Sequence, residues 1–315
     1  MPSRLRALLP ALVLALSVLV FLVAGAGLAL GREPFVSWYY CFAWWPYIFA
    51  VESLLALRGA ESDLYDHPRD WLLLPPLSVT LWLFFELLNF RLGNWSYLDL
   101  PASALERWAG YTLSFATVLP GLFATARLLE FLGLFRAVKC APLKDAHLLH
   151  LPLAFTGAAF LLLPLALPQF FFPLVWGALI FLLEPWVNGN GGRSLLGDWE
   201  QGQPRRFLLL LVAGLVCGGL WEFWNFQAGA KWVYDIPFVG GGKIFEMPVL
   251  GFLGFPPFAV ECYVAANAFL LLRERMADLP PERRRLFWSL VVAVVLVFDA
   301  LVLAGIDRFT VMSFR

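Results

Sequence analysis

The chain has 315 residues, of which 61% are hydrophobic and only 15% are charged, and its formal net charge is zero. Soluble domains are about 45–50% apolar and about 25% charged, so the composition excludes an ordinary soluble domain and predicts an integral membrane protein. The neutral balance gives no reason to expect nucleic acid as a partner. Four cysteines show no Cys-x-x-Cys spacing, so we expect neither a disulfide framework nor a metal site. We also expect no cofactor.

Nine apolar segments are long enough to cross a bilayer, because a spanning helix needs roughly 20 mostly apolar residues. In chain order they cover residues 5–30, 36–57, 71–91, 109–130, 148–166, 169–186, 206–228, 247–272 and 286–306. The first is longer than the roughly 7–15 residues of a signal-peptide core, so we expect a true span. The predicted fold is an all-α polytopic membrane protein with about nine transmembrane helices.

The distribution of basic residues predicts the orientation, because cytoplasmic loops are enriched in Lys and Arg. With the N-terminus in the cytoplasm, the inner segments hold most of these residues, including the run Arg283, Arg284 and Arg285. We therefore expect an N-terminus inside and a C-terminus outside, in a bacterial inner membrane.

The two halves of the chain carry the same polar residues at the same spacing. A shift that places Glu86 on Glu222 also aligns Asn89 with Asn225, Gly93 with Gly229, Asp99 with Asp235, Pro101 with Pro237 and Pro120 with Pro256. Such self-similarity predicts a tandem repeat. We expect a first four-helix repeat over 1–136, a second over 137–272, and a basic loop with a ninth helix over 273–315. Two parallel repeats imply a pseudo-two-fold axis along the membrane normal, with any site at their interface.

A Glu-x-x-Asn pair ends the third span (Glu86 and Asn89) and the seventh span (Glu222 and Asn225). Residues at i and i+3 share one helical face. An ionisable group costs about 2.5–3.5 kcal/mol at the centre of a membrane helix, and less near its end. Each pair is therefore either an acid held by an amide for function or a hydrogen bond that fixes helix packing.

An aromatic loop follows each pair. It contains Trp95 and Tyr97 in the first unit and Trp232 and Tyr234 in the second. These positions suit a belt at the membrane interface, and belt anchoring is the interpretation we favour over a role in a site.

The second unit has carboxylates that the first one lacks. Its segment "KIFEMPVLGFLGFPPFAVECY", residues 243–263, contains Glu246 and Glu261. We expect Glu246 near the N-terminus of the eighth span, where the helix dipole favours an anion. Pro256 and Pro257 should break or kink that span and open a cavity, with Glu261 beyond the kink and inside the span.

The order of these residues resembles the membrane lycopene cyclase domain, a carotenoid cyclase family that also occurs as tandem units. The resembling parts are 71–130 and 207–268. The resemblance implies that a carboxylate at the start of the last helix protonates one end of a polyene. Glu246 in "FEMP" is the residue of this sequence that stands near that position. The chain departs from the family by lacking its Pro-x-Glu-Glu motif, by having Glu222 where Asp is typical, and by having four spans per unit instead of three.

Three functions remain open. The first is an enzyme, a lycopene-cyclase-like isomerase that acts on an isoprenoid or other lipid by proton donation from a carboxylic acid, with aromatic rings stabilising the cation. The second is a small proton-coupled transporter or lipid carrier with its site at the repeat interface, and the third is a non-enzymatic membrane scaffold. A closed, lipid-accessible cavity in the second unit alone, with Glu246 or Glu261 facing it, would favour the enzyme. A path lined by both Glu-x-x-Asn pairs would favour the transporter, and no cavity at all would favour the scaffold.

The candidate catalytic acids are Glu222, Glu246 and Glu261. The candidate substrate-binding residues are Trp221, Trp224, Asn225, Trp232, Tyr234, Glu86 and Asn89, with Phe245 and Phe258 as further walls. The expected partners are a lipid or isoprenoid molecule, the membrane, and a second copy of the chain.

Overall fold

The computed structural model describes residues 3–238 and 241–312. Its main helices are α1 (Ser3–Ala29), α2 (Phe35–Leu57), α5 (Leu74–Leu92), α6 (Ala104–Phe115), α7 (Val118–Phe131), α8 (His150–Ala166), α10 (Ala178–Gly189), α12 (Arg205–Gln227), α13 (Phe255–Ala277) and α14 (Pro281–Phe309). Shorter helices are α3 (Asp63–Asp66), α4 (Pro68–Trp71), η1 (Ala146–Leu149), α9 (Pro168–Phe171), η2 (Phe172–Gly177), α11 (Leu195–Glu200) and η3 (Val249–Gly254). The fold is mostly helical, as predicted.

Nine helical segments in the described part of the chain are long and apolar enough to cross a membrane. They cover Leu8–Ala29, Phe35–Leu57, Pro68–Leu92, Ala104–Phe131, Ala146–Ala166, Pro168–Gly189, Arg205–Gln227, Val249–Ala277 and Pro281–Phe309. The number and positions of the predicted spans are confirmed, and the arrangement is compatible with an integral membrane protein.

Several of these segments are interrupted within their length. The fourth is divided between α6 and α7 at Ala116 and Thr117, and the eighth between η3 and α13 at Gly254. Pro256 and Pro257 occupy the first turn of α13, where a missing backbone N–H costs least. The 3₁₀ helix η3 passes directly into α13, so the structure shows a change of helix type at this point, and the predicted break or kink of the eighth span stays a prediction. Irregular backbone at this depth is tolerated where protein or a cavity covers it.

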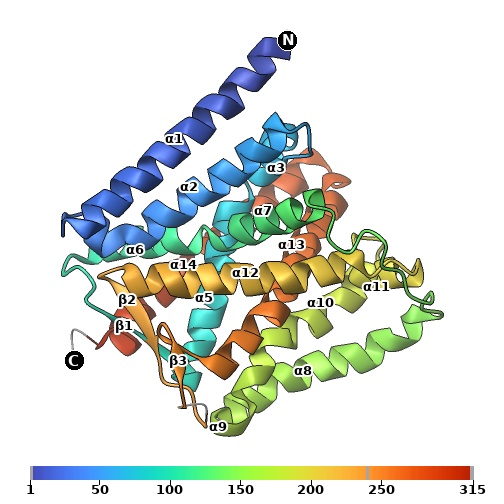
Figure 1. The fold of residues 1–315 in the computed structure, drawn as a ribbon. Helices are drawn as coiled ribbons and strands as arrows, with labels where there is room; N and C mark the ends of the chain where they lie inside the picture. Colours follow the sequence, from blue (N-terminus) through green and yellow to red (C-terminus); the bar gives the residue numbers. More distant parts are fainter. Residues whose placement is uncertain (1–2, 239–240, 313–315) are drawn as a thin grey trace.

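Short strands join the two halves of the chain at one end of the bundle (Figure 1). Strand β1 (Trp95–Leu98) pairs antiparallel with β2 (Lys231–Tyr234), with Trp95 opposite Tyr234 and Tyr97 opposite Trp232. A second hairpin joins β3 (Lys243–Ile244) to β4 (Met247–Pro248). Sequence periodicity predicts none of these strands, because each is only two to four residues long.

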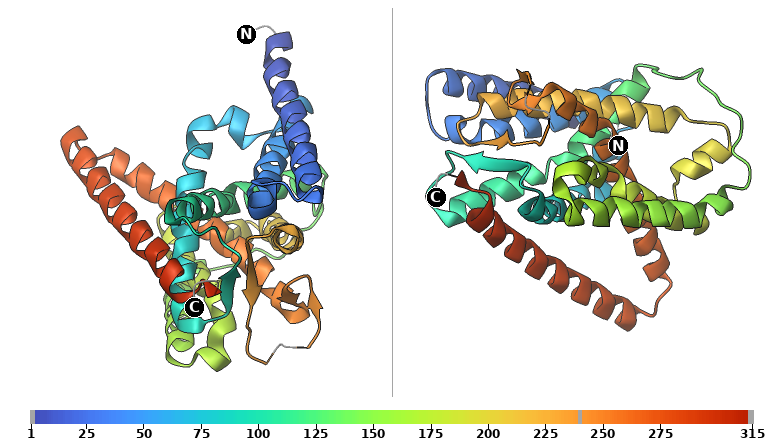
Figure 2. Two further views of the ribbon diagram at one scale, coloured as in Figure 1. Left: turned by 90° about the vertical axis from the view of Figure 1, so that its left-hand side faces the viewer. Right: turned by 90° about the horizontal axis from the view of Figure 1, so that it is seen from below.

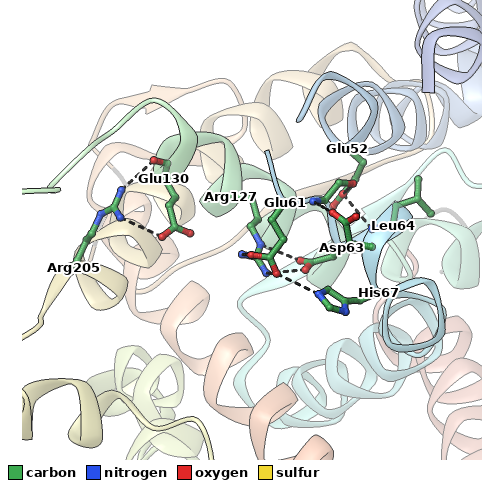
Figure 3. Close-up of polar contacts among 10 residues, drawn as sticks. Glu52, Glu61, Asp63, Leu64, His67, Arg127, Glu130 and Arg205 are labelled. Carbon is green, nitrogen blue, oxygen red and sulfur yellow. Dashed lines mark hydrogen bonds and ion pairs between the residues drawn. The ribbon is translucent and has the colours of Figure 1, made fainter. Parts of the chain in front are cut away.

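The end of the bundle opposite the strands is held by charged and polar contacts (Figures 1 and 3). Glu52, near the end of α2, accepts hydrogen bonds from the Ser62 hydroxyl and the Leu64 backbone N–H. Arg127 on α7 forms ion pairs with Glu61 at 2.9 Å and Asp63 at 2.8 Å.

Helix α14 lies along the outside of the bundle (Figure 2) and is tied to it by Asp307. The Asp307 carboxylate forms an ion pair with Arg107 at 2.7 Å and accepts hydrogen bonds from Trp108 Nε1 and the Tyr111 hydroxyl, both at 3.1 Å. These partners all belong to α6, so the ninth helix packs onto the first half of the chain.

A glycine substitution tests the packing of α12 on α13. Gly214 on α12 contacts α13 so closely that an added Cβ would overlap the Phe255 carbonyl oxygen, whereas Gly219 on the same helix has open space beside it. We expect Gly214→Ala to cost about 1–3 kcal/mol and to lower the thermal unfolding midpoint in detergent by several degrees. Gly219→Ala should leave the midpoint unchanged or raise it, because Ala favours helix by about 1 kcal/mol. Equal midpoints for the two variants would contradict this packing.

Candidate functional site

An aromatic cavity of about 350 Å³ lies between the two halves of the chain, beside β1 and β2. Six aromatic side chains from both halves form much of its wall: Tyr40, Trp82, Trp95, Trp176, Trp221 and Trp232. The volume lies within the roughly 300–1,000 Å³ of small-molecule sites. The cavity therefore suits an apolar ligand with π-faces or unsaturated bonds.

Glu222 brings a carboxyl group to the wall of this cavity. Its side chain is fully buried on α12, and one oxygen accepts a hydrogen bond of 2.7 Å from the Tyr234 hydroxyl. Trp232 Nε1 donates to the same hydroxyl at 2.7 Å. The second carboxyl oxygen, Oε2, has no hydrogen-bond partner among the described residues. Glu222 is the only carboxyl among the described residues that line the cavity.

Glu86 has the same kind of environment on α5. It is fully buried and accepts hydrogen bonds from the Tyr97 hydroxyl, from Trp95 Nε1 at 3.0 Å and from Trp82 Nε1 at 2.9 Å. These three side chains line the cavity, whereas Glu86 lies behind them. Glu86 therefore orients the aromatic wall from outside the cavity.

The two asparagines hold the aromatic strands by their backbones. Asn89 donates to the Trp95 carbonyl at 2.9 Å and accepts from the Asn94 N–H at 2.8 Å. Asn225 donates to the Trp232 carbonyl at 2.8 Å and accepts from its N–H at 3.0 Å. Each Glu-x-x-Asn pair thus binds the strand that follows it, through a ring hydroxyl and through the main chain. Both asparagines lie outside the cavity.

These contacts place the rings of Trp95 and Tyr97 in the protein interior rather than in a belt at the lipid surface. Their residues are only 6% and 5% exposed. Burial raises the pKa of Tyr97 and of Tyr234 well above the usual range, and the neighbouring Glu86 and Glu222 act in the same direction. Both tyrosines therefore remain phenols that donate to the carboxyl groups.

Neither Glu246 nor Glu261 is among the described residues that line the cavity. Glu246 lies in the turn between β3 and β4, where the positive φ of Phe245 reverses the chain, and not at the start of a helix. Its carboxylate is 3.6 Å from Lys231 Nζ. Glu261 is buried on α13 and accepts a hydrogen bond of 2.6 Å from the Leu179 backbone N–H at the start of α10. Glu261 therefore caps the start of α10. The cavity does lie beside the two prolines, since Pro257 and Phe258 line it, but Glu261 is not among the described residues of its wall.

The aromatic candidates also divide into residues that line the cavity and residues that do not. Trp221, Trp232, Tyr234 and Phe258 line the cavity with Glu222. Trp224 instead packs edge-on against Trp44, with ring centroids 4.8 Å apart, and lies outside the cavity.

Sequence reasoning missed Tyr40 and Trp176, which face the cavity from α2 and η2. The shift that aligns Glu86 with Glu222 also aligns these two residues, so the signal was present in the sequence.

It also missed the role of Glu184. Helix α10 continues past it, and Glu184 accepts hydrogen bonds of 2.7 Å from the Ser194 hydroxyl and the Leu196 N–H. Glu52 has the same spacing to Ser62 and Leu64 as Glu184 has to Ser194 and Leu196, and it accepts the same two kinds of hydrogen bond.

No family model matches the sequence, and no curated protein or solved structure is significantly similar to it.

Replacing Asn225 by Ala should loosen β2, although Asn225 itself does not line the cavity. Because the change leaves the Trp232 N–H and carbonyl without their side-chain partner, at about 1–3 kcal/mol, we expect amide hydrogen exchange in residues 228–236 to accelerate about 5- to 100-fold. Asn267→Ala is the control, since the hydrogen bond that Asn267 makes among the described residues lies within α13, to the Tyr263 carbonyl. Unchanged exchange in residues 228–236 of the Asn225→Ala protein would show that the amide does not hold the strand.

Proposed function

We propose that this protein is an integral membrane enzyme that takes the end of an unsaturated isoprenoid or similar lipid into the aromatic cavity and protonates it from Glu222. The observation that carries the proposal is a single buried carboxyl group at the wall of a cavity otherwise made largely of aromatic and aliphatic side chains. The resemblance to the membrane lycopene cyclase domain supports the same chemistry. Glu246 and Glu261 have structural roles in this proposal.

The proposed reaction is an isomerisation that needs no cofactor. The acid form of Glu222 transfers its proton to a carbon–carbon double bond, and a second double bond of the same molecule attacks the resulting cation. The π electrons of that second double bond form the ring bond, which leaves the positive charge on its other carbon. Loss of a proton from a neighbouring carbon then restores a double bond and returns Glu222 to its acid form. Aromatic faces within about 6 Å attract a cation, so the tryptophans of the wall would stabilise the intermediate while excluding water.

The hydrogen bond from Tyr234 positions the acid for this step. It binds one carboxyl oxygen, Oε1, and leaves Oε2 as the atom that delivers the proton. A general acid must lie within hydrogen-bond reach of the atom that it protonates, and this orientation fixes which oxygen can do so.

Access from the bilayer fits a lipid substrate. Leu250 and Leu253 on η3 line the cavity and are 62% and 68% exposed. An apolar chain could therefore enter sideways from the hydrocarbon region without crossing water. We propose that the N-terminus lies inside, as the distribution of basic residues predicts, and that the membrane is a bacterial inner membrane.

We also propose that the two halves are related by duplication around a pseudo-two-fold axis. The correspondence of Glu86 with Glu222, and of their tyrosine and asparagine contacts, supports it. The antiparallel pairing of β1 with β2 has its own local two-fold symmetry, as such an axis requires.

A proton-coupled transporter is the second candidate, because strands from both halves line the cavity, whereas the enzyme was expected to have a cavity in the second half alone. The position of Glu86 behind the wall argues against it, since a symmetric path would need both acids facing the cavity. A scaffold without a ligand would need no cavity.

The enzyme proposal is tested by deuterium incorporation. Purified protein in lipid nanodiscs is incubated in D₂O with farnesol, squalene and lycopene, and products are identified by chromatography and mass spectrometry. We expect an isomer that has gained one deuterium in place of one hydrogen, and a loss of about 10²–10⁴ in rate for Glu222→Gln.

Glu130→Gln is the matched control, because Glu130 pairs with Arg205 at the other end of the bundle (Figure 3). No product from any of the three substrates, or full activity in the Glu222→Gln protein, would overturn the proposal.

A further inference from the structure

Three polar atoms in residues that line the cavity lack a hydrogen-bond partner among the described residues. They are Glu222 Oε2, Trp221 Nε1 and Asn94 Oδ1. The three residues are 0%, 4% and 4% exposed. Trp221 and Glu222 come from α12, whereas Asn94 comes from the loop between α5 and β1, so the two halves of the chain both contribute.

Leaving such atoms unpaired is costly. A buried donor or acceptor without a partner loses about 1–3 kcal/mol, and the hydrocarbon region of a bilayer holds no water that could replace the lost partner. A pure hydrocarbon in the cavity would fill the aromatic surface but leave all three atoms unpaired. The ligand that fits best therefore has a polar atom of its own.

The chemistry of the three atoms indicates what that polar group is. The indole N–H of Trp221 can only donate, and the amide oxygen of Asn94 can only accept. A hydroxyl group both accepts and donates, so it can satisfy one atom of each kind.

The charge of the lining residues excludes an anionic group. The described residues that line the cavity include no Lys, Arg or His. Lys231, next to Trp232, is 3.6 Å from the Glu246 carboxylate. A diphosphate would enter a low-dielectric site without a counter-ion, at a cost that the aromatic walls cannot offset.

We infer that the substrate of this site is a neutral isoprenoid or lipid alcohol, whose hydroxyl group is bound between Trp221 Nε1 and Asn94 Oδ1 while its apolar chain contacts the aromatic wall. That this ligand is the substrate rests on the proposed function. Its chemical class rests only on the unpaired atoms and on the absence of Lys, Arg and His among the described residues that line the cavity.

Binding of three matched probes tests the inference without any turnover. Farnesol, trans-β-farnesene and farnesyl diphosphate share an apolar chain of the same length and differ in the terminal group. Each is titrated into the protein in nanodiscs, its free concentration is corrected for partition into the lipid, and binding is followed by quenching of the cavity tryptophans. We expect farnesol to bind at least about tenfold more tightly than farnesene, and the diphosphate to bind no more tightly than farnesene.

Two variants assign the preference to the proposed atoms. Trp221→Phe removes the N–H but keeps an aromatic ring, and Asn94→Ala removes the acceptor. Each should reduce the preference for farnesol to about threefold or less while farnesene still binds, which also shows that the variant is folded. Trp199→Phe on α11, outside the cavity, is the control and should keep the full preference.

Equal affinities for farnesol and farnesene would overturn the inference, as would tighter binding of the diphosphate or an undiminished preference in both variants. The outcome is separate from the enzyme proposal. A selective site whose Glu222→Gln variant keeps full deuterium incorporation would retain the ligand class and remove the proton donor.

Discussion

The structure depends on one constraint: a polar group buried within the thickness of a bilayer must find its partner in the protein. Glu86 and Glu222 are fully buried, and one oxygen of each meets the constraint by binding the hydroxyl of a tyrosine that lies one short loop further along the chain. The loop is thereby folded back over the end of its own helix. Each carboxyl group therefore positions a Trp-x-Tyr strand.

Two strands held in this way can pair with each other, and their pairing brings aromatic rings from both halves around one cavity. The halves do not contribute equally to its volume. Gly251 and Gly254 line the cavity in the second half, where the proposed repeat aligns them with Phe115 and Val118 of the first. Because the second half has glycine at these two positions, the cavity keeps open space beside η3. The same asymmetry leaves Glu222 at the wall while Glu86 is covered by Trp82, Trp95 and Tyr97.

The spans were predictable because a run of roughly 20 apolar residues is a strong and local signal. The Glu-x-x-Asn pairs were also predictable as a pattern, but their partners were not. The hydrogen bonds to Trp95 and Trp232 form only when the loop after each pair folds back over the end of its helix. Glu246 was misplaced for a related reason: a carboxylate before a long apolar run suggests a helix start, whereas Phe245 at positive φ turns the chain into a hairpin. Glu261 lies on the predicted helix, yet only the tertiary fold could show that it binds the start of α10.

The most direct test of this account is a disulfide between Ser96→Cys and Val233→Cys in a protein with Cys140→Ser and a protease site in the exposed loop near residue 140. These residues are directly opposite in the β1–β2 pair, where Cα separations of about 4.5–5.5 Å suit a disulfide. Under mild oxidation in native membranes, we expect the two fragments to stay joined after cleavage and to separate on reduction, while a control pair of Ser96→Cys with Glu200→Cys on α11, far from β1 (Figure 1), does not join them. Fragments that separate without reductant, as in the control, would contradict the pairing of the halves on which the cavity depends.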